Sequence, residues 1–374
     1  MKRFQKQRKE NIRIHPGEMF RQSWNEQIIE KELKRAQRDE DLPRFDLDKV
    51  EIHPSKSCNL TCAWCYGRNV VPPINERRDL PATVIRDILK DIREEMPKQD
   101  PLIIYAGLYS EPLMNRAFSS IMDITGKECF RFGIYTNGLL MNPELADVVA
   151  QSAKNTRDSR PSYITFNLSS SFDSKKKNVL ENILNVIKET DKSRKKNNSP
   201  LLLNGSLLAY HQDISKYKEI LEETKKRGID NIRFSFPWNA QKNESNHDFG
   251  GLTGNEYKRF SEEFLKLKET YPDLVSIRFP PMKLFDHCFV GTQALSISSE
   301  GDVFPCPEVS SLLFKKTHSY GNIYDEKISR IWHSDSHKEM FLKLDPYMVE
   351  KKCVCCYMDE EINRHCSKYW IKRE

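Results

Sequence analysis

Three closely spaced cysteines could hold a catalytic metal centre. Cys58, Cys62 and Cys65 are separated by three and then by two residues. Cysteine thiolates hold four-iron clusters, and three thiolates leave one of the four irons open. A catalytic metal needs such an open coordination position. A zinc-binding loop is the alternative, but zinc sites typically use paired Cys-x2-Cys hooks and four ligands. The spacing therefore favours an iron–sulfur cluster with one open iron.

A second group of cysteines lies near the C-terminus. Cys288 and Cys306 have 17 residues between them, and Cys353 and Cys356 form a Cys-x2-Cys pair. Four thiolates are enough to hold a cluster that has no open iron. This group therefore predicts a closed metal site in the last part of the chain.

Other ligand sets are open for this second site. Cys355 can replace Cys356, and Cys366 can complete a variant of the site. Zinc held by Cys353, Cys356, His365 and Cys366 is a further alternative.

From Val50 onward, short apolar runs alternate with amphipathic helices. This alternation predicts repeated βα units and a parallel sheet. We expect an α/β fold with a partial TIM-like barrel of six βα repeats, whose reactive face is formed by the loops that follow the strands. Cys129 precedes the third strand, at the opposite end, and is predicted to be a small buried apolar residue. The expected strands are 50–53, 102–106, 131–136, 163–168, 201–209 and 231–236; the expected helices include one that begins near Pro81 and the segments 143–153, 178–190 and 214–227.

The chain divides into three expected parts. Residues 1–48 are highly charged with apolar positions at helical spacing, which predicts a helical N-terminal extension. Residues 49–285 form the barrel. Residues 286–374 carry the second cysteine group and few long periodic elements, which predicts a small iron–sulfur domain stabilised by its metal.

The first cysteine group resembles the signature of the radical S-adenosylmethionine (radical SAM) superfamily. Cys58-x3-Cys62-x2-Cys65, with the aromatic Trp64 before the last cysteine, is similar to the motif of that family. The resemblance implies that the three cysteines hold a 4Fe-4S cluster whose open iron binds S-adenosylmethionine. It also implies that one electron splits the sulfonium, and that the resulting 5′-deoxyadenosyl radical takes a hydrogen atom from a substrate.

The same resemblance implies which residues contact S-adenosylmethionine. Residues 107–113 are similar to the family's Gly-Gly-Glu-Pro segment, with Ser110 in place of a glycine and Glu111 as the carboxylate that holds the methionyl amino group. Thr136-Asn137-Gly138 is also similar to a family segment, and Asn167-Leu168-Ser169 stands where the family often has Ser-Leu-Asp. Each polar residue alone would more often cap a loop or a helix. The implied cofactor contacts are Trp64, Ser110, Glu111, Asn137, Asn167, Ser169 and Asn204.

The C-terminal part resembles the SPASM and twitch domains of radical SAM enzymes. The stretch from Cys288 to Cys306, with Gly301 before the second cysteine, is similar to their motif, as is the segment 321–332. The later cysteine series of a full SPASM domain is absent from the sequence. The resemblance therefore implies one auxiliary 4Fe-4S cluster, the twitch arrangement, held by Cys288, Cys306, Cys353 and Cys356.

The amino-acid composition narrows the binding partners and the cellular location that we expect for the protein. The net charge is +6 with acids and bases interspersed, so we expect no nucleic-acid partner. No apolar run approaches the roughly 18 residues that cross a bilayer, and the N-terminus is too charged for a signal peptide. Ten cysteines then favour metal ligation in the cytoplasm, where thiols stay reduced. The resemblance also implies a reducing partner such as flavodoxin or ferredoxin.

We expect an enzyme, and more specifically an oxidoreductase. An auxiliary cluster fully ligated by protein suits electron uptake better than substrate anchoring. The first hypothesis is oxidation of a small biosynthetic substrate of the sugar or aminocyclitol type, because the roughly 50 residues before the first strand are short for a module that binds a leader peptide. The alternatives are a maturase that crosslinks, epimerises or oxidises a ribosomally made peptide or protein, and a non-catalytic metal-stabilised binding module. No catalytic base is identified; His211 and Arg233 lie near the expected reactive face.

Overall fold

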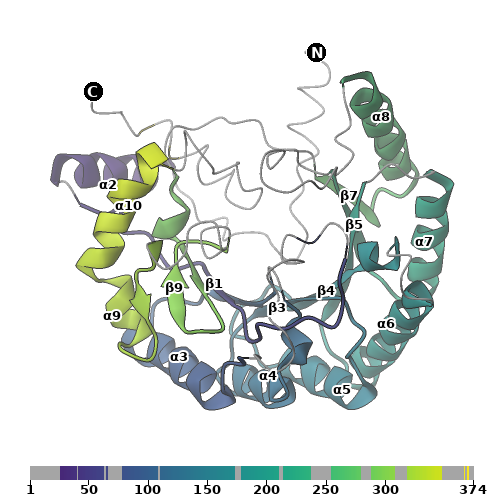
Figure 1. Cartoon of the computed structure of the whole chain (residues 1–374), viewed down its shortest axis with the longest axis horizontal. Coiled ribbons are helices and arrows are strands. Elements are labelled where there is room, and N and C mark those ends of the chain that lie inside the picture. The colour runs from purple at the N-terminus through teal and green to yellow at the C-terminus, as the bar shows by residue number, and fades with distance from the viewer. Residues whose placement is uncertain are drawn as a thin grey trace.

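One ten-stranded sheet organises the molecule (Figure 1). The computed structural model describes residues 26–39, 41–62, 65, 78–107, 110–172, 178–209, 214–236, 254–278, 288–307, 318–347, 366 and 369. Within these residues the strands follow the order β10-β9-β8-β1-β2-β3-β4-β5-β6-β7, and the two ends of the sheet do not pair with each other. The expected α/β fold with an open, partial barrel is confirmed.

Seven parallel strands in chain order form the barrel, each hydrogen-bonded to the next. The first six match the predicted strands to within one or two residues at each end. The seventh adds one strand beyond the six predicted repeats and extends the same edge. The strands are β1 (Lys49–Ile52), β2 (Leu102–Tyr105), β3 (Phe132–Thr136), β4 (Tyr163–Asn167), β5 (Leu202–Leu208), β6 (Asn231–Ser235) and β7 (Val275–Arg278).

Helices surround the outer, convex face of this sheet (Figure 1). The first of them, α3 (Ala82–Glu95), follows Pro81 and buries Ile85, Ile88, Leu89 and Ile92, one apolar stripe at helical spacing. Its stripe joins the outward-facing strand residues in the main hydrophobic core. The other outer helices are α4 (Phe118–Lys127), α5 (Pro143–Ser152), α6 (Val179–Lys196), α7 (Ile214–Lys226) and α8 (Gly254–Thr270); three short 3-10 turns are η3 (Pro112–Met114), η4 (Leu168–Phe172) and η5 (Val290–Thr292).

Two helix ends show how local sequence sets these boundaries. The Asn142 side chain accepts a hydrogen bond of 2.8 Å from the Leu145 N–H and so caps α5. After α7, Gly228 has a φ of +94°, a left-handed conformation that glycine adopts without strain. Cys129, after α4, also has a positive φ, +58°, and it is half-buried, so the prediction of a buried apolar cysteine is wrong. Its carbonyl accepts a hydrogen bond from Arg93, which indicates a role in ending the helix.

The C-terminal region continues the barrel sheet. Strand β8 (Ala294–Ile297) pairs in parallel with β1, so that Leu295 lies opposite Val50. Strands β9 (Asp302–Phe304) and β10 (Gly321–Asn322) then add in antiparallel orientation. Helices α9 (Ile328–Trp332) and α10 (Asp335–Tyr347) follow. Main-chain hydrogen bonds therefore join the C-terminal region directly to the first barrel strand.

The N-terminal helix α2 (Glu26–Asp39) lies beside α10 (Figure 1). Its Ile29 and Leu33 share one apolar cluster with Phe289, Phe341 and Cys366. The beginning of the described chain thus packs against the C-terminal region.

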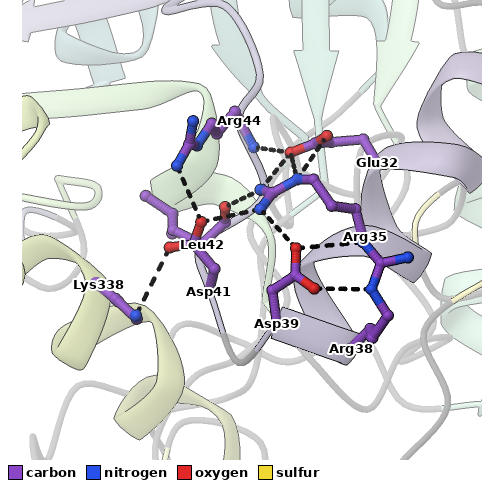
Figure 2. Close-up of polar contacts among 8 residues, drawn as sticks. All are labelled: Glu32, Arg35, Arg38, Asp39, Asp41, Leu42, Arg44 and Lys338. Carbon is purple, nitrogen blue, oxygen red and sulfur yellow. Dashed lines mark hydrogen bonds and ion pairs between the residues drawn. The ribbon is translucent and has the colours of Figure 1, made fainter.

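A polar network fixes the segment that follows this helix (Figure 2). The guanidinium of Arg35 donates to Glu32 at 2.7 Å, to Asp41 at 2.9 Å and to the Leu42 carbonyl at 2.9 Å. Glu32 also accepts the Arg44 backbone N–H at 2.6 Å. These bonds fold residues 41–44 back against the helix.

None of the described helices is long and apolar enough to cross a membrane.

Candidate functional site

The first cysteine group lies in the loop after β1, at the carboxyl end of the parallel strands. Cys62 is buried, and Cys58 and Cys65 are half-buried. The Leu60 N–H points at the Cys58 sulfur, 3.4 Å away, and the Cys65 N–H donates to the Cys62 carbonyl at 3.1 Å. These two bonds curl the loop on itself. Trp64 lies outside the described residues.

The thiols have the chemistry that an iron–sulfur cluster needs. The pKa of Cys58 is raised to about 11, chiefly by burial and also by the neighbouring Glu111 and Cys65, while backbone hydrogen bonds from Leu60 and Asn59 oppose the shift. A bound metal removes this obstacle because it replaces the thiol proton. Among the described residues, no three Cys, His, Asp or Glu side chains converge as they would around a single ion. A four-iron cluster is larger than one ion, so its three cysteines can stand further apart.

Glu111 connects the neighbouring strand ends to this loop. Its backbone N–H donates to the Ser57 carbonyl at 2.8 Å, directly beside Cys58. Its carboxylate is only 2% exposed and accepts from the Thr136 hydroxyl at 2.6 Å and from the Asn137 N–H at 2.8 Å. A third bond, from the Leu113 N–H at 3.1 Å, caps the η3 turn. A carboxylate offers about four lone-pair positions, so one remains for a ligand.

The environment of Glu111 places its titration near neutrality. Burial raises the pKa of Glu111 to about 7, although the hydrogen bonds from Asn137, Thr136 and Leu113 lower it. A cationic ligand group beside this carboxyl would favour its ionised form. Ser110 is half-buried, in a turn so tight that a side chain at Gly107 would collide with the Ser110 carbonyl.

Asn137 joins a third strand end to the cysteine loop. Its side-chain N–H donates to the Asn59 side-chain oxygen at 2.8 Å, and Asn59 follows Cys58 directly. Its own side-chain oxygen accepts the Leu139 N–H at 3.0 Å. The loops after β1, β2 and β3 are therefore bound into one unit that contains the three cysteines, Glu111 and Asn137.

The other implied cofactor contacts lie on β4 and β5. Asn167 accepts the Ser169 N–H at 3.1 Å, and the Ser169 hydroxyl accepts the Leu208 N–H at 2.8 Å, so both residues support the turn at the end of β4. Asn204 lies deeper, in the middle of β5 opposite Thr165. It is fully buried, and within the described part of the chain neither its amide nitrogen nor its amide oxygen has a hydrogen-bond partner.

Sequence reasoning missed a polar layer around Asn204. Tyr135, Thr165 and Asn204 lie side by side in register on β3, β4 and β5. The hydroxyl groups of Tyr135 and Thr165 are also buried, and no described residue is hydrogen-bonded to either of them. Arg233 on β6 places its guanidinium 6.0 Å from the centre of the Tyr135 ring and 3.5 Å from the Ser206 hydroxyl. The available signal was a polar residue at alternate positions of otherwise apolar strands, which marks the inner face.

The second cysteine group is described in part. Cys288 and Cys306 are both buried and share one apolar cluster with Val290, Ala294 and Phe304. Cys353 and Cys356 lie outside the described residues, as do the alternatives Cys355 and His365. Cys366 instead packs among the apolar side chains beneath α2, and burial strongly raises its pKa.

The surroundings of Cys288 and Cys306 also suit a cluster. The Tyr320 hydroxyl is buried without a hydrogen-bond partner. Burial raises the pKa of Tyr320 well above its usual value, and the nearby thiols of Cys306 and Cys288 raise it further. A buried donor close to two buried thiols is what a sulfur-rich, anionic group could satisfy.

His337 holds this region together. Its Nδ1 lies 2.7 Å from the Trp332 carbonyl and its Nε2 lies 2.6 Å from the Gly291 carbonyl. Because carbonyls only accept, both ring nitrogens donate in this arrangement, which requires the protonated ring. Burial works against that charge by lowering the pKa of His337. The ring stacks between Tyr320 and Trp332, with centroid separations of 4.4 and 4.6 Å.

Comparisons with known proteins concern the C-terminal segment and the overall fold. The SPASM family model, described as an iron–sulfur cluster-binding domain, matches residues 288–358. No curated protein sequence matches the chain. Among solved structures, Streptococcus suis SuiB bound to S-adenosylmethionine superposes with a TM-score of 0.60 and 13% identity, over 88% of this chain and 75% of that one. SuiB bound to its precursor peptide SuiA gives a TM-score of 0.61 and 14% identity, over 88% and 73% of the two chains.

These likenesses are of different kinds. At such low identity, the likeness to SuiB shows a shared fold, whereas the family match concerns the segment that contains Cys288 and Cys306. The chain thus combines an open α/β barrel that shares its fold with SuiB and a C-terminal segment that matches the SPASM iron–sulfur cluster-binding domain.

Proposed function

We propose that the chain cleaves S-adenosylmethionine at a 4Fe-4S cluster held by Cys58, Cys62 and Cys65, and that it oxidises a substrate. The observation that carries this proposal is the hydrogen-bonded unit at three neighbouring strand ends. It ties the cysteine loop to the buried carboxylate of Glu111 through Ser57, and to Asn137 through Asn59. A site that must hold a cluster and a cationic cofactor together needs this kind of rigid support.

Each part of the unit has a distinct task. When bound, the cluster and S-adenosylmethionine would supply a 5′-deoxyadenosyl radical that abstracts hydrogen from the substrate. Glu111 would accept the methionyl ammonium at its remaining lone-pair position and stay ionised beside it. Asn137 would keep the loop after β3 against the cysteine loop. Trp64, Ser110, Asn167, Ser169 and Asn204 remain proposed contacts of the same cofactor.

We further propose that Cys288, Cys306, Cys353 and Cys356 hold one auxiliary 4Fe-4S cluster, which accepts the second electron of the oxidation. The burial of Cys288 and Cys306 in an apolar cluster supports this role. Thiolates closed off from solvent suit electron transfer better than the binding of a substrate.

A small polar substrate, such as a sugar or an aminocyclitol, is the substrate class we favour. The support is the buried layer of Tyr135, Thr165 and Asn204, whose hydroxyl and amide groups have no partner within the described protein. A ligand rich in hydroxyl or amino groups would satisfy them, because buried polar groups are costly to leave unpaired.

A ribosomally made peptide is the second candidate. The fold shared with SuiB, which has been solved with its precursor peptide, favours it. Hydrogen transfer from substrates deuterated at the candidate carbon into 5′-deoxyadenosine separates the two classes: polyols and aminocyclitols on one side, peptides on the other. Transfer from peptides alone would overturn the small-molecule proposal.

The test of the chemistry uses anaerobically reconstituted protein, either wild type or with Cys58, Cys62 and Cys65 replaced by Ala. We expect about eight irons per wild-type chain and about four in the triple variant, with 5′-deoxyadenosine formed by wild type alone. Cys129→Ala is the matched control, because this cysteine is half-buried and lies at the opposite end of the barrel. Cleavage retained in the triple variant would contradict the proposal, and no cleavage by iron-loaded wild type would favour a non-catalytic binding module.

A further inference from the structure

The Tyr320 hydroxyl is an unpaired donor inside the C-terminal region. Tyr320 is 3% exposed, and its hydroxyl oxygen has no hydrogen-bond partner among the residues that the structure describes. A buried hydroxyl without a partner is destabilising, so folded proteins rarely retain one without a use. The hydroxyl lies so close to Gly291 that a side chain at that position would collide with it. A larger residue would therefore displace it.

Two structural features fix the direction of this hydroxyl. The Tyr320 ring stacks on His337, which is itself held by the carbonyls of Trp332 and Gly291. The Tyr320 backbone N–H donates to the Val303 carbonyl at 2.7 Å, between β9 and β10. The ring is thus held from both ends.

The nearby groups identify what the hydroxyl faces. A side chain at Gly291 would meet both the Tyr320 hydroxyl and, at 3.3 Å, the side chain of Pro305, which directly precedes Cys306. The thiols of Cys306 and Cys288 also raise the pKa of Tyr320. Gly291, at the hydroxyl, belongs to the η5 turn that begins two residues after Cys288. The apolar side chains of Val290, Ala294 and Phe304 surround the two cysteines. Among the described side chains around the hydroxyl, the thiols of Cys288 and Cys306 are therefore the acceptors that fit.

We propose that Tyr320 is a positioning residue of the auxiliary cluster, whose hydroxyl donates a hydrogen bond to a cluster sulfur and raises the reduction potential of that cluster. This inference rests on the proposed ligation by Cys288 and Cys306. Reduction adds one electron and makes the cluster more negative, so a donor aimed at its sulfur stabilises the reduced state more than the oxidised state. The hydrogen bond thereby makes the cluster a better acceptor of the electron released in an oxidation.

The test measures the midpoint potential of the auxiliary cluster alone. The host is the full chain with Cys58, Cys62 and Cys65 replaced by Ala, so that one cluster gives the electron paramagnetic resonance signal during a titration with dithionite. In that host we expect Tyr320→Phe to keep about four irons and to weaken reduction about tenfold, which is about 59 mV for one electron.

Tyr105→Phe is the matched control. Tyr105 is equally buried, but its hydroxyl bonds Thr125 at 2.6 Å, and no cysteine is among the groups that shift its pKa. We expect the potential of the cluster in this control to equal that of the host. An unchanged potential in an iron-loaded Tyr320→Phe variant would overturn the inference.

Two further measurements keep the outcome decisive. If Tyr320→Phe loses iron, replacement of Tyr320 by 3-fluorotyrosine keeps the ring and strengthens the donor; a higher potential supports the inference and an equal one overturns it. Cys288→Ala and Cys306→Ala test the underlying ligation separately. Full iron in both of these variants would overturn the ligation together with the role of Tyr320.

Discussion

The two cysteine regions lie on neighbouring strands of one sheet but have opposite surroundings. Around Cys58 and Cys65 the thiols are half-buried and the neighbouring loops are polar and cross-linked by hydrogen bonds. Around Cys288 and Cys306 the thiols are buried among apolar side chains. Strand β1 leads into the first region, whereas β8 follows Cys288 in the second, and the two strands pair with each other along their whole length.

Under the proposed function, this difference assigns a separate task to each region. A site that binds a cofactor and a substrate must stay open and must contain groups that recognise polar ligands. A site that passes electrons needs no access for a ligand, and burial helps to set its potential. Because Cys58 follows β1 and Cys288 precedes β8, the parallel pairing of these strands places the two sites at opposite ends of the pair and so keeps their environments separate.

The largest expected effect comes from replacing one proposed cluster ligand in each region. Cys65→Ala is expected to remove the first cluster and reduce 5′-deoxyadenosine formation to background. Cys306→Ala is expected to lose about four irons and to retain cleavage of S-adenosylmethionine, while oxidation of the substrate fails. Iron analysis and product assays on the same preparations check this. If Cys306→Ala also abolishes cleavage of S-adenosylmethionine in protein that keeps its remaining four irons, the two regions do not have separate tasks.

A core substitution in α2 is expected to weaken the C-terminal region alone. Leu33 is fully buried against Phe289 and Phe341, next to Cys288. Leu33→Ala should cost about 2–5 kcal/mol and release auxiliary iron at lower denaturant concentration. Leu221→Ala, at an equally buried position in α7 of the barrel, is the control. Equal loss of auxiliary iron from both variants would show that α2 gives this region no special support.

The pH dependence of cofactor binding tests the open site. Free Glu111 has a pKa of about 7, raised by burial, and a bound ammonium group would lower it. The affinity for S-adenosylmethionine should therefore be greatest above pH 7. Below pH 7 it should fall by up to about tenfold for each pH unit, because the Glu111 carboxyl must first release a proton. Calorimetry from pH 5.5 to 8.5, roughly 1.5 units on either side of the pKa, measures the affinity for S-adenosylmethionine at each pH. Glu111→Gln should bind more weakly and without this dependence; the same slope in that variant would assign the titration to another group.

The smallest expected effect concerns the ion pair that bridges the two regions. Lys56, in the loop that leads to Cys58, lies 2.9 Å from Glu300, in the turn between β8 and β9. Both side chains are partly exposed, so Lys56→Met should change the free energy of unfolding by less than about 1 kcal/mol and leave cleavage of S-adenosylmethionine unchanged. A loss of cleavage would mean that this pair positions the cysteine loop.

Much of the barrel could be predicted from local patterns. The six predicted strands agree with β1 to β6 because apolar runs of strand length alternate with helical stripes such as Ile85, Ile88 and Ile92. The seventh strand, Val275–Arg278, has only four residues, and a run that short is hard to distinguish from a loop. The pairing of β8 with β1 was missed for another reason: it joins residues about 245 positions apart, and no local signal reports such a contact.

The sequence by itself determined the α/β class, the two cysteine groups and the identity of Glu111 and Asn137 as polar residues at strand ends, because spacing and periodicity are local properties. Only the tertiary structure decided which of these residues meet. It bonds Glu111 and Asn137 to the cysteine loop, and it gathers Tyr135, Thr165 and Asn204 into one buried layer. It also places Tyr320 beside Cys288 and Cys306. These relations depend on strand register and on packing between distant segments. Burial then changes the chemistry of both regions. It raises the pKa of Glu111 to about 7, and it encloses the Tyr320 hydroxyl, which has no hydrogen-bond partner among the described residues.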